Sequence, residues 1–466
     1  MQDRIFQLNQ AKPAEGQHVV YVMSRDQRLH DNHALLAAQQ NALQQKLPLV
    51  IFFNVLPKTG FRAREHYQFM LEGLKELAEN AKKFNISFII KTGSAKENLH
   101  KLEKLLQPSA IYFDFSPLTG PRQLHQQFAN TAPCPCYEVD THNIIPARIA
   151  SDHQEFAAHT FRSKVHARLA QYLLAPAKLV KHPYTSSIKI ANDWPDSKFL
   201  NTVPANHTRI AFISGETAAN TQLQTFIHHG LASFAKERNN PIVDGTSNLS
   251  PYLHYGQISS LRVALEVLQN VKKDPLLFKE ARLASAGETP SNEDGMNALF
   301  EEMIVRKELS DNFCFYAKSY TTFSSVPAWA NNTLQKHTSD RREQTYTKKQ
   351  WEEATTHDSA WNAAQIQLKK CGKIHGYMRM YWAKKLLEWS ETPQDALETA
   401  IYLNDHYSID GGDPNGYVGI LWSIAGLHDR PWIERPVFGQ IRYMNYEGLK
   451  RKFDIEQYCQ KWTTEL

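Results

Sequence analysis

The first third of the chain alternates short apolar runs with longer amphipathic stretches. The runs are nearly continuous in Val, Ile, Phe and Tyr, which is typical of strands buried on both faces. They lie at 18–24, 47–56, 86–93, 110–116 and 137–145. Between them, Leu and Phe recur at helical spacing. This alternation predicts a Rossmann-like α/β domain over residues 1–180, with a doubly wound parallel sheet.

The periodicity changes after this domain. Residues 181–225 are rich in Pro, Ser, Asn and Thr, which predicts an inter-domain connector that crosses the surface. From 226 to 466 the apolar positions follow helical spacing, and strand-like alternation is nearly absent. This part is predicted to be an all-α domain, large enough to enclose a big ligand between its helices.

The composition removes several classes of protein. The chain has 466 residues, 42% hydrophobic and 22% charged, which is ordinary for a globular protein of two domains. No run of 18 apolar residues occurs and the polar start lacks a signal-peptide core, so we expect a cytoplasmic protein, nucleoid-associated in a prokaryote. Five cysteines, an odd count, argue against a disulfide framework, and Cys134 and Cys136 lack a second ligand pair for zinc.

Nucleotide-binding motifs are missing from the α/β domain. No GxGxxG follows the first strand and no GxxxxGK[ST] occurs anywhere, which disfavours a dinucleotide dehydrogenase or a P-loop enzyme. An adenylyl-transferring enzyme would also need a phosphate loop here. The loop at 24–32 still follows the first strand, where ligands of such sheets gather.

Two motifs in the helical part carry polar groups that suit a ligand. The segment 244–259, DGTSNLSPYLHYGQIS, places small hydroxyl residues before a helix, which suits either a phosphate cradle or a plain N-cap. Glu302 and Arg306 are four residues apart, so a helix would put them on one face. That pair is either a surface ion pair or a carboxyl that faces a pocket.

Aromatic and charged residues concentrate toward the C-terminus. Seven of the nine tryptophans follow position 350, and Trp382 and Trp389 share a helix face, with Arg379 one turn before. They form a core stripe or a functional set, because buried indoles need a partner for their N–H. Acids and glycines cluster at 401–426, where the glycines allow close approach to a ligand. The segment 428–453 interleaves cations with rings, as a nucleic-acid surface needs, although the net charge of +5 only permits such binding.

Together these segments resemble the class II cyclobutane pyrimidine dimer DNA photolyases, a branch of the photolyase–cryptochrome superfamily. RLHDN at 28–32 resembles the N-terminal pattern of the whole superfamily. The motifs similar to class II are DGTSNLSPYLHYGQIS, ELSDNFC, KIHGYMRMYWAKKLLEW, IYLNDHYSIDGGDPNGYVG and RPVFGQIRYMNYEGLKRKFD. The likeness runs from about residue 18 to 455, in the family's order and spacing.

The resemblance implies an FAD cofactor held in the helical domain and an antenna chromophore, a deazaflavin or a folate, in the α/β domain of some members. Arg379 and Asp410 would pair beside the isoalloxazine, and Asn404 would face its N5. Phe234 stands where relatives often have tyrosine, which puts one phosphate hydrogen bond in question. The cofactor-binding residues implied are Phe234, Thr246, Ser247, Asn248, Leu249, Ser250, Arg379, Asn404, Asp410 and Asp413.

The implied reaction is light-driven repair, in which reduced FAD donates an electron to a pyrimidine dimer flipped out of damaged DNA. Glu302 would hydrogen-bond the dimer, and Met380 and Trp422 would pack on it. Trp382, Trp361 and Trp389 would reduce the flavin from the surface. The implied DNA-binding residues are Arg430, Trp432, Arg442, Lys450 and Arg451. We expect a monomer, in which Arg306 stands where many relatives outside class II have a stacking tryptophan.

Two light-dependent alternatives stay open. A cryptochrome-like FAD light sensor without repair activity is the stronger one, although little chain follows the KRKFD motif to form the long tail common in that class. A (6–4) photolyase would use a histidine pair, whereas here His375 is followed one turn later by Arg379.

Overall fold

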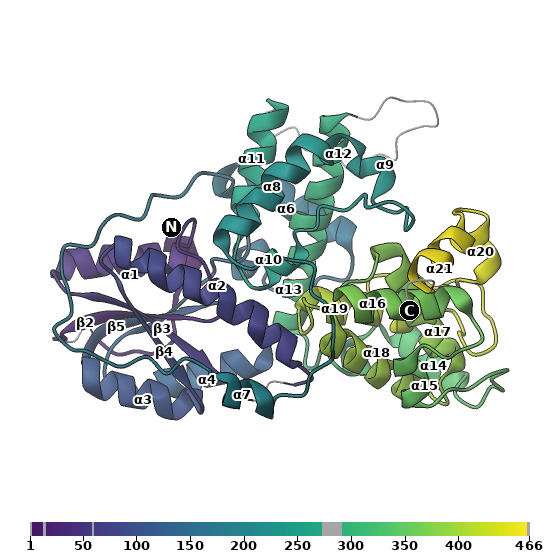
Figure 1. The fold of residues 1–466 in the computed structure, drawn as a ribbon, viewed down its shortest axis with the longest axis horizontal. Coiled ribbons are helices and arrows are strands. Elements are labelled where there is room, and N and C mark those ends of the chain that lie inside the picture. Colours follow the sequence, from purple (N-terminus) through teal and green to yellow (C-terminus); the bar gives the residue numbers. More distant parts are fainter. Residues whose placement is uncertain (1, 13–14, 58–59, 273–290, 464–466) are drawn as a thin grey trace.

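The computed structural model describes residues 2–12, 15–57, 60–272 and 291–463. An α/β domain occupies one end of the elongated molecule and helices occupy the other (Figure 1). The sheet has the strand order β1-β6-β5-β2-β3-β4. Its strands are β1 Ile5–Gln7, β2 His18–Met23, β3 Leu49–Val55, β4 Ser87–Thr92, β5 Pro108–Asp114 and β6 Cys136–Val139.

Strands β2 to β6 are parallel, and only β1 runs antiparallel, against β6. Val19 and Tyr21 of β2 pack on one face of the sheet, whereas Val20 and Val22 pack on the other. Both faces are therefore apolar, which explains the continuous apolar runs in the sequence. The predicted fold class is confirmed, but β1 was missed because three residues carry no clear alternation.

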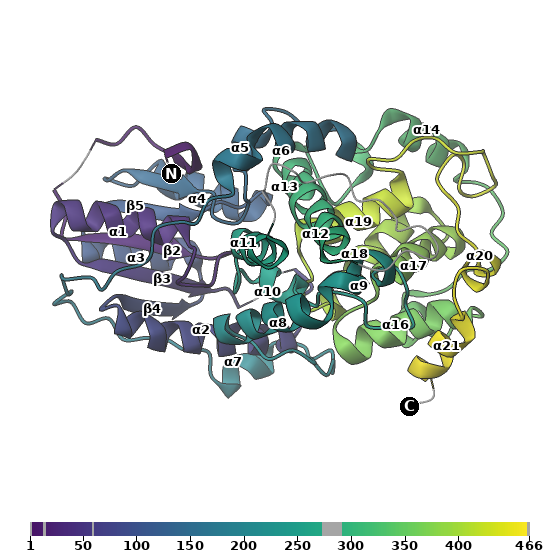
Figure 2. The same cartoon turned by 90° about the horizontal axis from the view of Figure 1, so that it is seen from above.

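Helices cover both faces of the sheet, as Figure 2 shows from above. One face packs against α1 and α2 and the other against α3 and α4. The short helices η1 and α5 flank these elements. The bounds are η1 Gln2–Arg4, α1 His33–Gln45, α2 Arg64–Lys83, α3 Ala95–Leu106, α4 Thr119–Ala129 and α5 Ala147–Ala150.

A long connector leaves α6 (Ala158–Tyr172), passes around the α/β domain and reaches α8 (Glu216–His229) (Figure 1). It is not fully irregular, because it contains α7 (Ser197–Thr202). The Asp193 amide donates to the Ile90 carbonyl at 2.9 Å, and Asn192 Oδ1 accepts from the Ile90 amide at 3.0 Å. The connector therefore covers the open edge of β4, which would otherwise expose unpaired backbone groups.

The rest of the chain is helical, as predicted. One continuous apolar core joins the sheet to α8–α12, and a second core fills the C-terminal helices. The elements are α9 Leu231–Glu237, α10 Ser250–His254, α11 Ser260–Val271, α12 Asn292–Phe300, η3 Glu301–Arg306, α13 Lys307–Tyr316, η4 Phe323–Ser325, α14 Ala328–Lys336, α15 Lys348–Glu353, α16 Ser359–Cys371, α17 Gly376–Trp389, α18 Pro393–Tyr407, α19 Pro414–Ala425, α20 Tyr446–Lys450 and α21 Ile455–Thr463. In the described part of the chain, no helix has both the length and the hydrophobicity needed to cross a bilayer.

The segment η3 between α12 and α13 is a π-helix rather than an α-helix. Its i→i+5 turns bring residues five apart together. Arg306 accordingly pairs with Glu301, with Nε 3.0 Å from Oε1, and Glu302 pairs with Arg238 instead. Of the two alternatives left open for Glu302, an ion pair with Arg306 is therefore not formed, because that pair assumed α-helical spacing.

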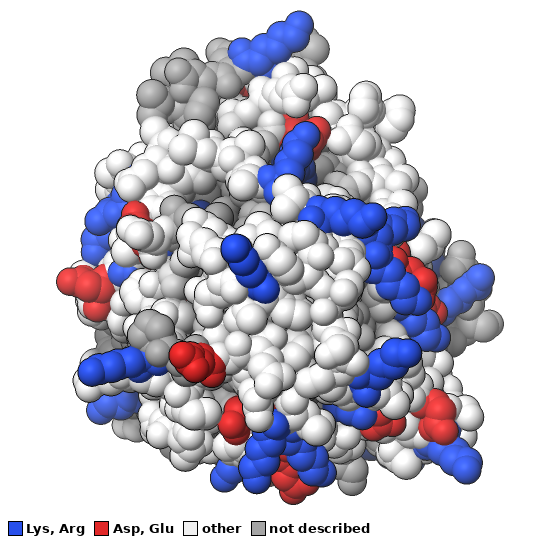
Figure 3. Space-filling view, turned by 90° about the vertical axis from the view of Figure 1, so that its left-hand side faces the viewer, with Lys and Arg blue, Asp and Glu red and all other residues white. Residues whose placement is uncertain are grey.

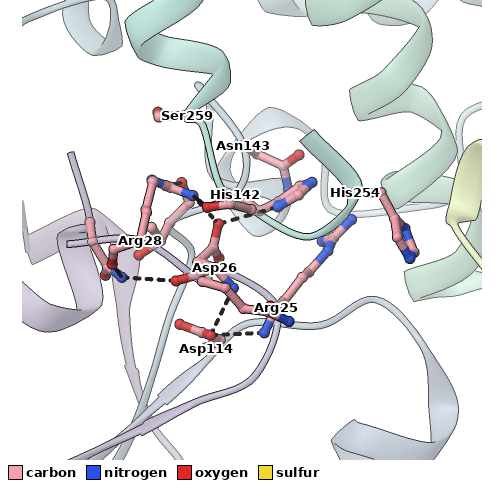
Figure 4. Close-up of polar contacts among 12 residues, drawn as sticks. Arg25, Asp26, Arg28, Asp114, His142, Asn143, His254 and Ser259 are labelled. Atoms are coloured by element: carbon pink, nitrogen blue, oxygen red, sulfur yellow. Dashed lines mark hydrogen bonds and ion pairs between the residues drawn. The ribbon is translucent and has the colours of Figure 1, made fainter. Parts of the chain in front are cut away.

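A buried polar cluster joins the α/β domain to the helical part (Figure 4). Asp114 Oδ2 accepts hydrogen bonds from three backbone amides of the loop after β2. Arg28 Nη1 donates to Asp26 Oδ1 at 2.7 Å and to the Gly256 carbonyl at 3.0 Å. Gly256 has φ +64°, and a Cβ atom there would lie 2.3 Å from the Arg25 carbonyl oxygen. The loop thus meets the helical part backbone to backbone, which requires glycine.

The outer face of the α/β domain, at the left of Figure 1, carries both signs of charge. In Figure 3 its Lys and Arg side chains lie mostly toward the rim, with Asp and Glu among them, around a largely uncharged middle. The described residues of this face therefore form no continuous positive surface for phosphates. The expected DNA-binding residues belong to the opposite end of the molecule, near α20 (Figure 1).

Candidate functional site

The centre of the site is a group of polar contacts that joins α17 to α18 and to the loop after α18. Arg379 Nη1 donates to Asn404 Oδ1 at 2.8 Å, and its Nη2 lies 4.0 Å from Asp410 Oδ1. Ser408 Oγ donates to Asp410 Oδ1 at 2.5 Å. Burial opposes ionisation of Asp410, but the Arg379 charge and the Ser408 hydroxyl hold its pKa below the ordinary value. The cluster therefore presents a fixed cation beside a fixed anion.

Asn404 is held in one orientation. Its side chain is buried, and its Nδ2 donates to Asp405 Oδ1 at 2.9 Å while its Oδ1 accepts from Arg379. A Cβ atom at Gly416 would lie 2.9 Å from Asn404 Nδ2, so glycine is needed for α19 to pack here. The sequence indicated Asn404 but not that Asp405 is its partner. Nothing in the sequence distinguishes Asp405 from the other acids of the cluster at 401–426.

Asp413 lies close by but has a different set of partners. Its Oδ1 caps α19 by accepting from the Asn415 amide at 2.9 Å, and its Oδ2 accepts from His254 Nδ1 at 2.9 Å. Despite burial, His254 holds the pKa of Asp413 well below its usual range. Asp413 thus connects α19 to α10, the helix that follows the hydroxyl-rich loop at 244–249.

That loop lines a cavity of about 550 Å³. Thr246 and Asn248 contribute to its wall, and Lys373 reaches across to donate to Thr246 Oγ1 at 3.1 Å and to Asn248 Oδ1. Burial lowers the pKa of Lys373 to about 8, against the charges of Asp244 and Asp410, which raise it. The Lys373 ammonium, the Thr246 hydroxyl and the Asn248 amide therefore lie together in the wall of this cavity. The sequence did not indicate Lys373, which stood beside a more conspicuous aromatic stripe.

The remaining loop residues have structural partners. Leu249 is buried, the Ser247 carbonyl accepts from Gln222, and Ser250 begins α10. Phe234 is buried, with its ring 5.3 Å from that of Phe226. His375 also lines the cavity, and its Nε2 is buried without a partner in the described structure. Burial lowers the pKa of His375 to about 4, so this ring is neutral.

Glu302 differs sharply from its neighbour. Glu301 is buried and pairs with both Arg162 and Arg306, so it is committed to the fold. The Glu302 side chain is 48% exposed and, among the described residues, pairs only with Arg238, whose guanidinium lies 6.0 Å from the Phe234 ring centre. Of the two acids, Glu302 is the one that a ligand can reach.

A second cavity, of about 220 Å³, lies at the C-terminal end. Met380, Trp422 and Arg442 line it, together with Tyr377, Tyr443, Met444, Asn445, Gly448, Leu449 and Lys452. The Arg442 guanidinium lies 5.9 Å from the Trp422 ring centre and 4.8 Å from that of Trp432. Met380 and Trp422, which were expected to pack on the dimer, and Arg442, which was expected to bind DNA, thus line one cavity.

Cations and rings alternate outward from this opening. Arg430 lies 5.7 Å from the ring centre of Trp432, which is 38% exposed. Arg451 is exposed as well, whereas Lys450 forms an ion pair of 2.8 Å with Glu456. Lys450 is therefore partly neutralised, and Arg430, Arg442 and Arg451 are the cations more available to phosphates.

The tryptophans form a cluster of four. Trp382 and Trp361 are parallel to within 6°, with ring centres 6.3 Å apart. Trp351 lies 4.6 Å from Trp361 and 6.2 Å from Trp389, nearly parallel to the latter. The indole of Trp382 donates to Gln365 Oε1 and that of Trp361 to the Trp382 carbonyl. The structure brings the three expected indoles together and adds Trp351, which the sequence did not single out.

Comparison with known proteins gives this site its context. A family model described as DNA photolyase matches residues 19–183. The chain is 44% identical to the deoxyribodipyrimidine photo-lyase of Potorous tridactylus, over 96% of this chain and 81% of the relative. It is 36% identical to the deoxyribodipyrimidine photo-lyase of Methanothermobacter thermautotrophicus, over 98% of both chains. The chain belongs to the DNA photolyase family.

Membership of the DNA photolyase family confirms the resemblance and the enzyme class predicted from the sequence. A relative from Oryza sativa subsp. japonica, 41% identical over 95% of this chain and 87% of its own length, carries the same enzyme name. Proteins of the photolyase and cryptochrome family bind FAD, and photolyases act on damaged DNA, as expected for this chain.

Two solved structures share the DNA photolyase fold. They are a class III photolyase from Agrobacterium tumefaciens (TM-score 0.73, 17% identity, 98% of this chain and 88% of that chain) and a Synechocystis cryptochrome (TM-score 0.74, 17% identity, 97% and 90%). Because one is a photolyase and the other a cryptochrome, the fold alone does not separate repair from light sensing.

Proposed function

We propose that this protein is a class II photolyase that repairs cyclobutane pyrimidine dimers in DNA, as a monomer, with reduced FAD and light. The observation that carries the proposal is the cluster in which Arg379 contacts both Asn404 and Asp410, together with the cavity that Lys373, Thr246 and Asn248 line. One end of this arrangement suits a ring with hydrogen-bonding edges, and the other suits a pyrophosphate.

The polar groups that line the first cavity can be compared with those that FAD needs. Lys373, Thr246 and Asn248 supply an ammonium, a hydroxyl and an amide, which are the groups that bind phosphate oxygens. The charges of Asp410 and Arg379 both shift the pKa of Lys373, so the two ends of the site interact electrostatically. These residues fit the cofactor. When it is bound there in reduced form, FAD supplies an electron after it absorbs light.

The protein's own residues orient this chemistry. Arg379 stabilises negative charge on the ring system, and Asn404, fixed by Arg379 and Asp405, presents a preorganised carboxamide. Met380 and Trp422 form an apolar wall in the second cavity, against which a flipped dimer can pack. Arg442 and Trp432 occupy the gap that the dimer leaves and hold the backbone.

Glu302 acts on the base edge of the dimer. Glu302 is paired with Arg238, so dimer binding requires its side chain to turn from Arg238 toward the base edge. A hydrogen bond from Glu302 would then stabilise negative charge on the dimer while its cyclobutane bonds open.

Repair of a thymine dimer in a short oligonucleotide tests this function. The purified protein is reduced chemically with dithionite and incubated with the oligonucleotide in light and in the dark. We expect intact thymines in light only. A protein that binds FAD but restores no thymine under light would contradict the proposal and would favour the cryptochrome-like sensor.

A further inference from the structure

The path of ring contacts from the site toward the surface has a break that a fourth indole fills. Ring contacts join Trp382 to Trp361, Trp361 to Trp351 and Trp351 to Trp389. Among the described residues, no direct ring contact joins Trp361 to Trp389. Trp351 comes from α15, whereas the other three come from α16 and α17, so sequence spacing alone does not reveal it.

We infer that Trp351 is an additional electron carrier, which connects Trp361 to Trp389 when oxidised FAD is reduced by light. The inference rests on the proposed function, because it concerns how the flavin reaches its active form. Electron transfer between rings slows steeply with separation. A path of three contacts at 6.3, 4.6 and 6.2 Å is therefore favoured over a step that skips Trp351.

The position of Trp351 is rigidly held. Its side chain is 1% exposed, and its indole lies within 11° of the Trp389 plane. A capping box fixes the start of α15, in which Thr347 and Gln350 satisfy each other's backbone amides. The ring is therefore presented at a fixed distance and angle, as a relay needs.

The surrounding charges allow a positive charge to move outward. Lys385 Nζ lies 4.9 Å from the Trp389 ring centre, which would disfavour a positive charge on that ring. Glu388 Oε2 lies 2.5 Å from the same ammonium and largely offsets it. Within the described residues, no cation lies over the Trp351 ring. His357 and Tyr346 then flank Trp389, with ring centres 4.6 and 6.0 Å away, and His357 is exposed.

Each photon would move one electron along this path, and a thiol in solution would replace it. With oxidised FAD bound and excited by light, Trp382 would lose one electron to it, and Trp361, Trp351 and Trp389 would each pass one electron inward in turn. The positive charge thus ends on Trp389. An added thiol returns one electron to Trp389 and loses its proton to solvent, and pairs of oxidised thiols combine to a disulfide. A second round would supply the second electron of fully reduced FAD, which would take one proton from solvent, so two thiols for each FAD suffice.

Photoreduction of the oxidised, FAD-loaded protein in the presence of a thiol tests the inference. We expect Trp351→Phe and Trp389→Phe each to slow flavin reduction about tenfold, and the double variant to be no slower than either. Trp329→Phe, which removes an indole outside the cluster, should leave the rate unchanged. Transient absorption should show a shorter-lived oxidised tryptophan in Trp351→Phe than in the parent protein.

Two further measurements separate this step from folding and from repair. The near-UV circular dichroism of the FAD-free variant reports whether the remaining indoles keep their packing, and Trp351→Met fills the site if phenylalanine disturbs it. Dithionite-reduced Trp351→Phe should repair dimers at the parent rate, because chemical reduction bypasses the path. Normal photoreduction in both Trp351 variants would overturn the inference, whereas loss of repair in the reduced parent protein would instead overturn the proposed function.

Discussion

Arg25 of the α/β domain and Asp311 of α13 form a two-point ion pair, with nitrogen–oxygen distances of 2.7 and 2.8 Å. The Asp311 side chain is fully buried, and Asn143 Nδ2 also donates to it at 3.0 Å. Burial opposes the charge on Asp311, but Arg25 holds its pKa below the ordinary value. Two parts of the chain almost 300 residues apart are thus fastened by one buried pair.

Arg25→Met should lower the free energy of unfolding by about 3–5 kcal/mol, because it leaves the Asp311 carboxylate buried without its cation. Urea denaturation followed by circular dichroism measures this change. Lys82→Met, which breaks the exposed pair with Glu79, is the matched control and should cost less than about 1 kcal/mol. Equal losses in the two variants would show that the interdomain pair carries no special weight.

Acid should destabilise the protein through its buried histidines. Burial lowers the pKa of His66 to about 4, and His66 Nε2 donates to the Ser408 carbonyl at 2.7 Å, next to the Arg379 cluster. Between pH 6.5 and 4 the unfolded state binds more protons than the folded state, so stability falls as the pH falls. The loss from His66 amounts to about 3 kcal/mol across that window.

His66→Gln keeps a donor for Ser408 but does not titrate, so its stability should depend less on pH over the same window. Urea midpoints at pH 6.5, 5 and 4 measure the difference. His207→Gln replaces an exposed histidine and should keep the parent dependence. If His66→Gln lost stability as steeply as the parent protein, this group would not be responsible.

Lys373→Met should weaken FAD binding about 10- to 100-fold, because it removes a charge-assisted hydrogen bond to phosphate. Riboflavin has no phosphate, so its affinity should not change. Fluorescence titration of the FAD-free protein with each compound measures both. Because the pKa of Lys373 is about 8, the parent protein's affinity for FAD should also fall as the pH rises through that value. Equal weakening for riboflavin would place Lys373 outside the phosphate end.

Glu302→Ala should slow repair about 10- to 100-fold without releasing FAD, since it removes one hydrogen bond to the dimer. Single-turnover repair under saturating light, with flavin absorbance as the measure of occupancy, gives both values. Glu301→Gln is the informative neighbour, because Glu301 holds Arg162 and Arg306 and should affect stability instead. Loss of flavin from Glu302→Ala would indicate a structural role.

Trp432→Ala and Arg442→Ala should weaken binding to dimer-containing duplex about tenfold or more. Arg442→Ala should also reduce the salt dependence of binding, because it removes a phosphate contact, whereas Trp432→Ala should leave that slope unchanged. Fluorescence anisotropy at several salt concentrations measures both quantities. Lys450→Ala, already paired with Glu456, should have the smallest effect.

The sequence predicted the fold class and the broad position of the site because long apolar runs and long motifs carry both. It did not predict β1, whose three residues have no periodicity, or α7 within the connector. It also missed Lys373 and Trp351, whose roles depend on neighbours from distant helices. The sequence left open whether Glu302 pairs with Arg306, because the residue types of 301–306 do not distinguish a π-helix from an α-helix.

That π-helical segment has a consequence for how the family's sequences can vary. Each residue added to a helix rotates all that follows by about 100°, so the extra residue within η3 sets the angular phase between α12 and α13. Deleting one residue from 301–306 would restore α-helical geometry in this segment. Asp311 would then rotate about the helix axis and would no longer point at Arg25. Gaps in this short stretch should therefore be rare among members of the family.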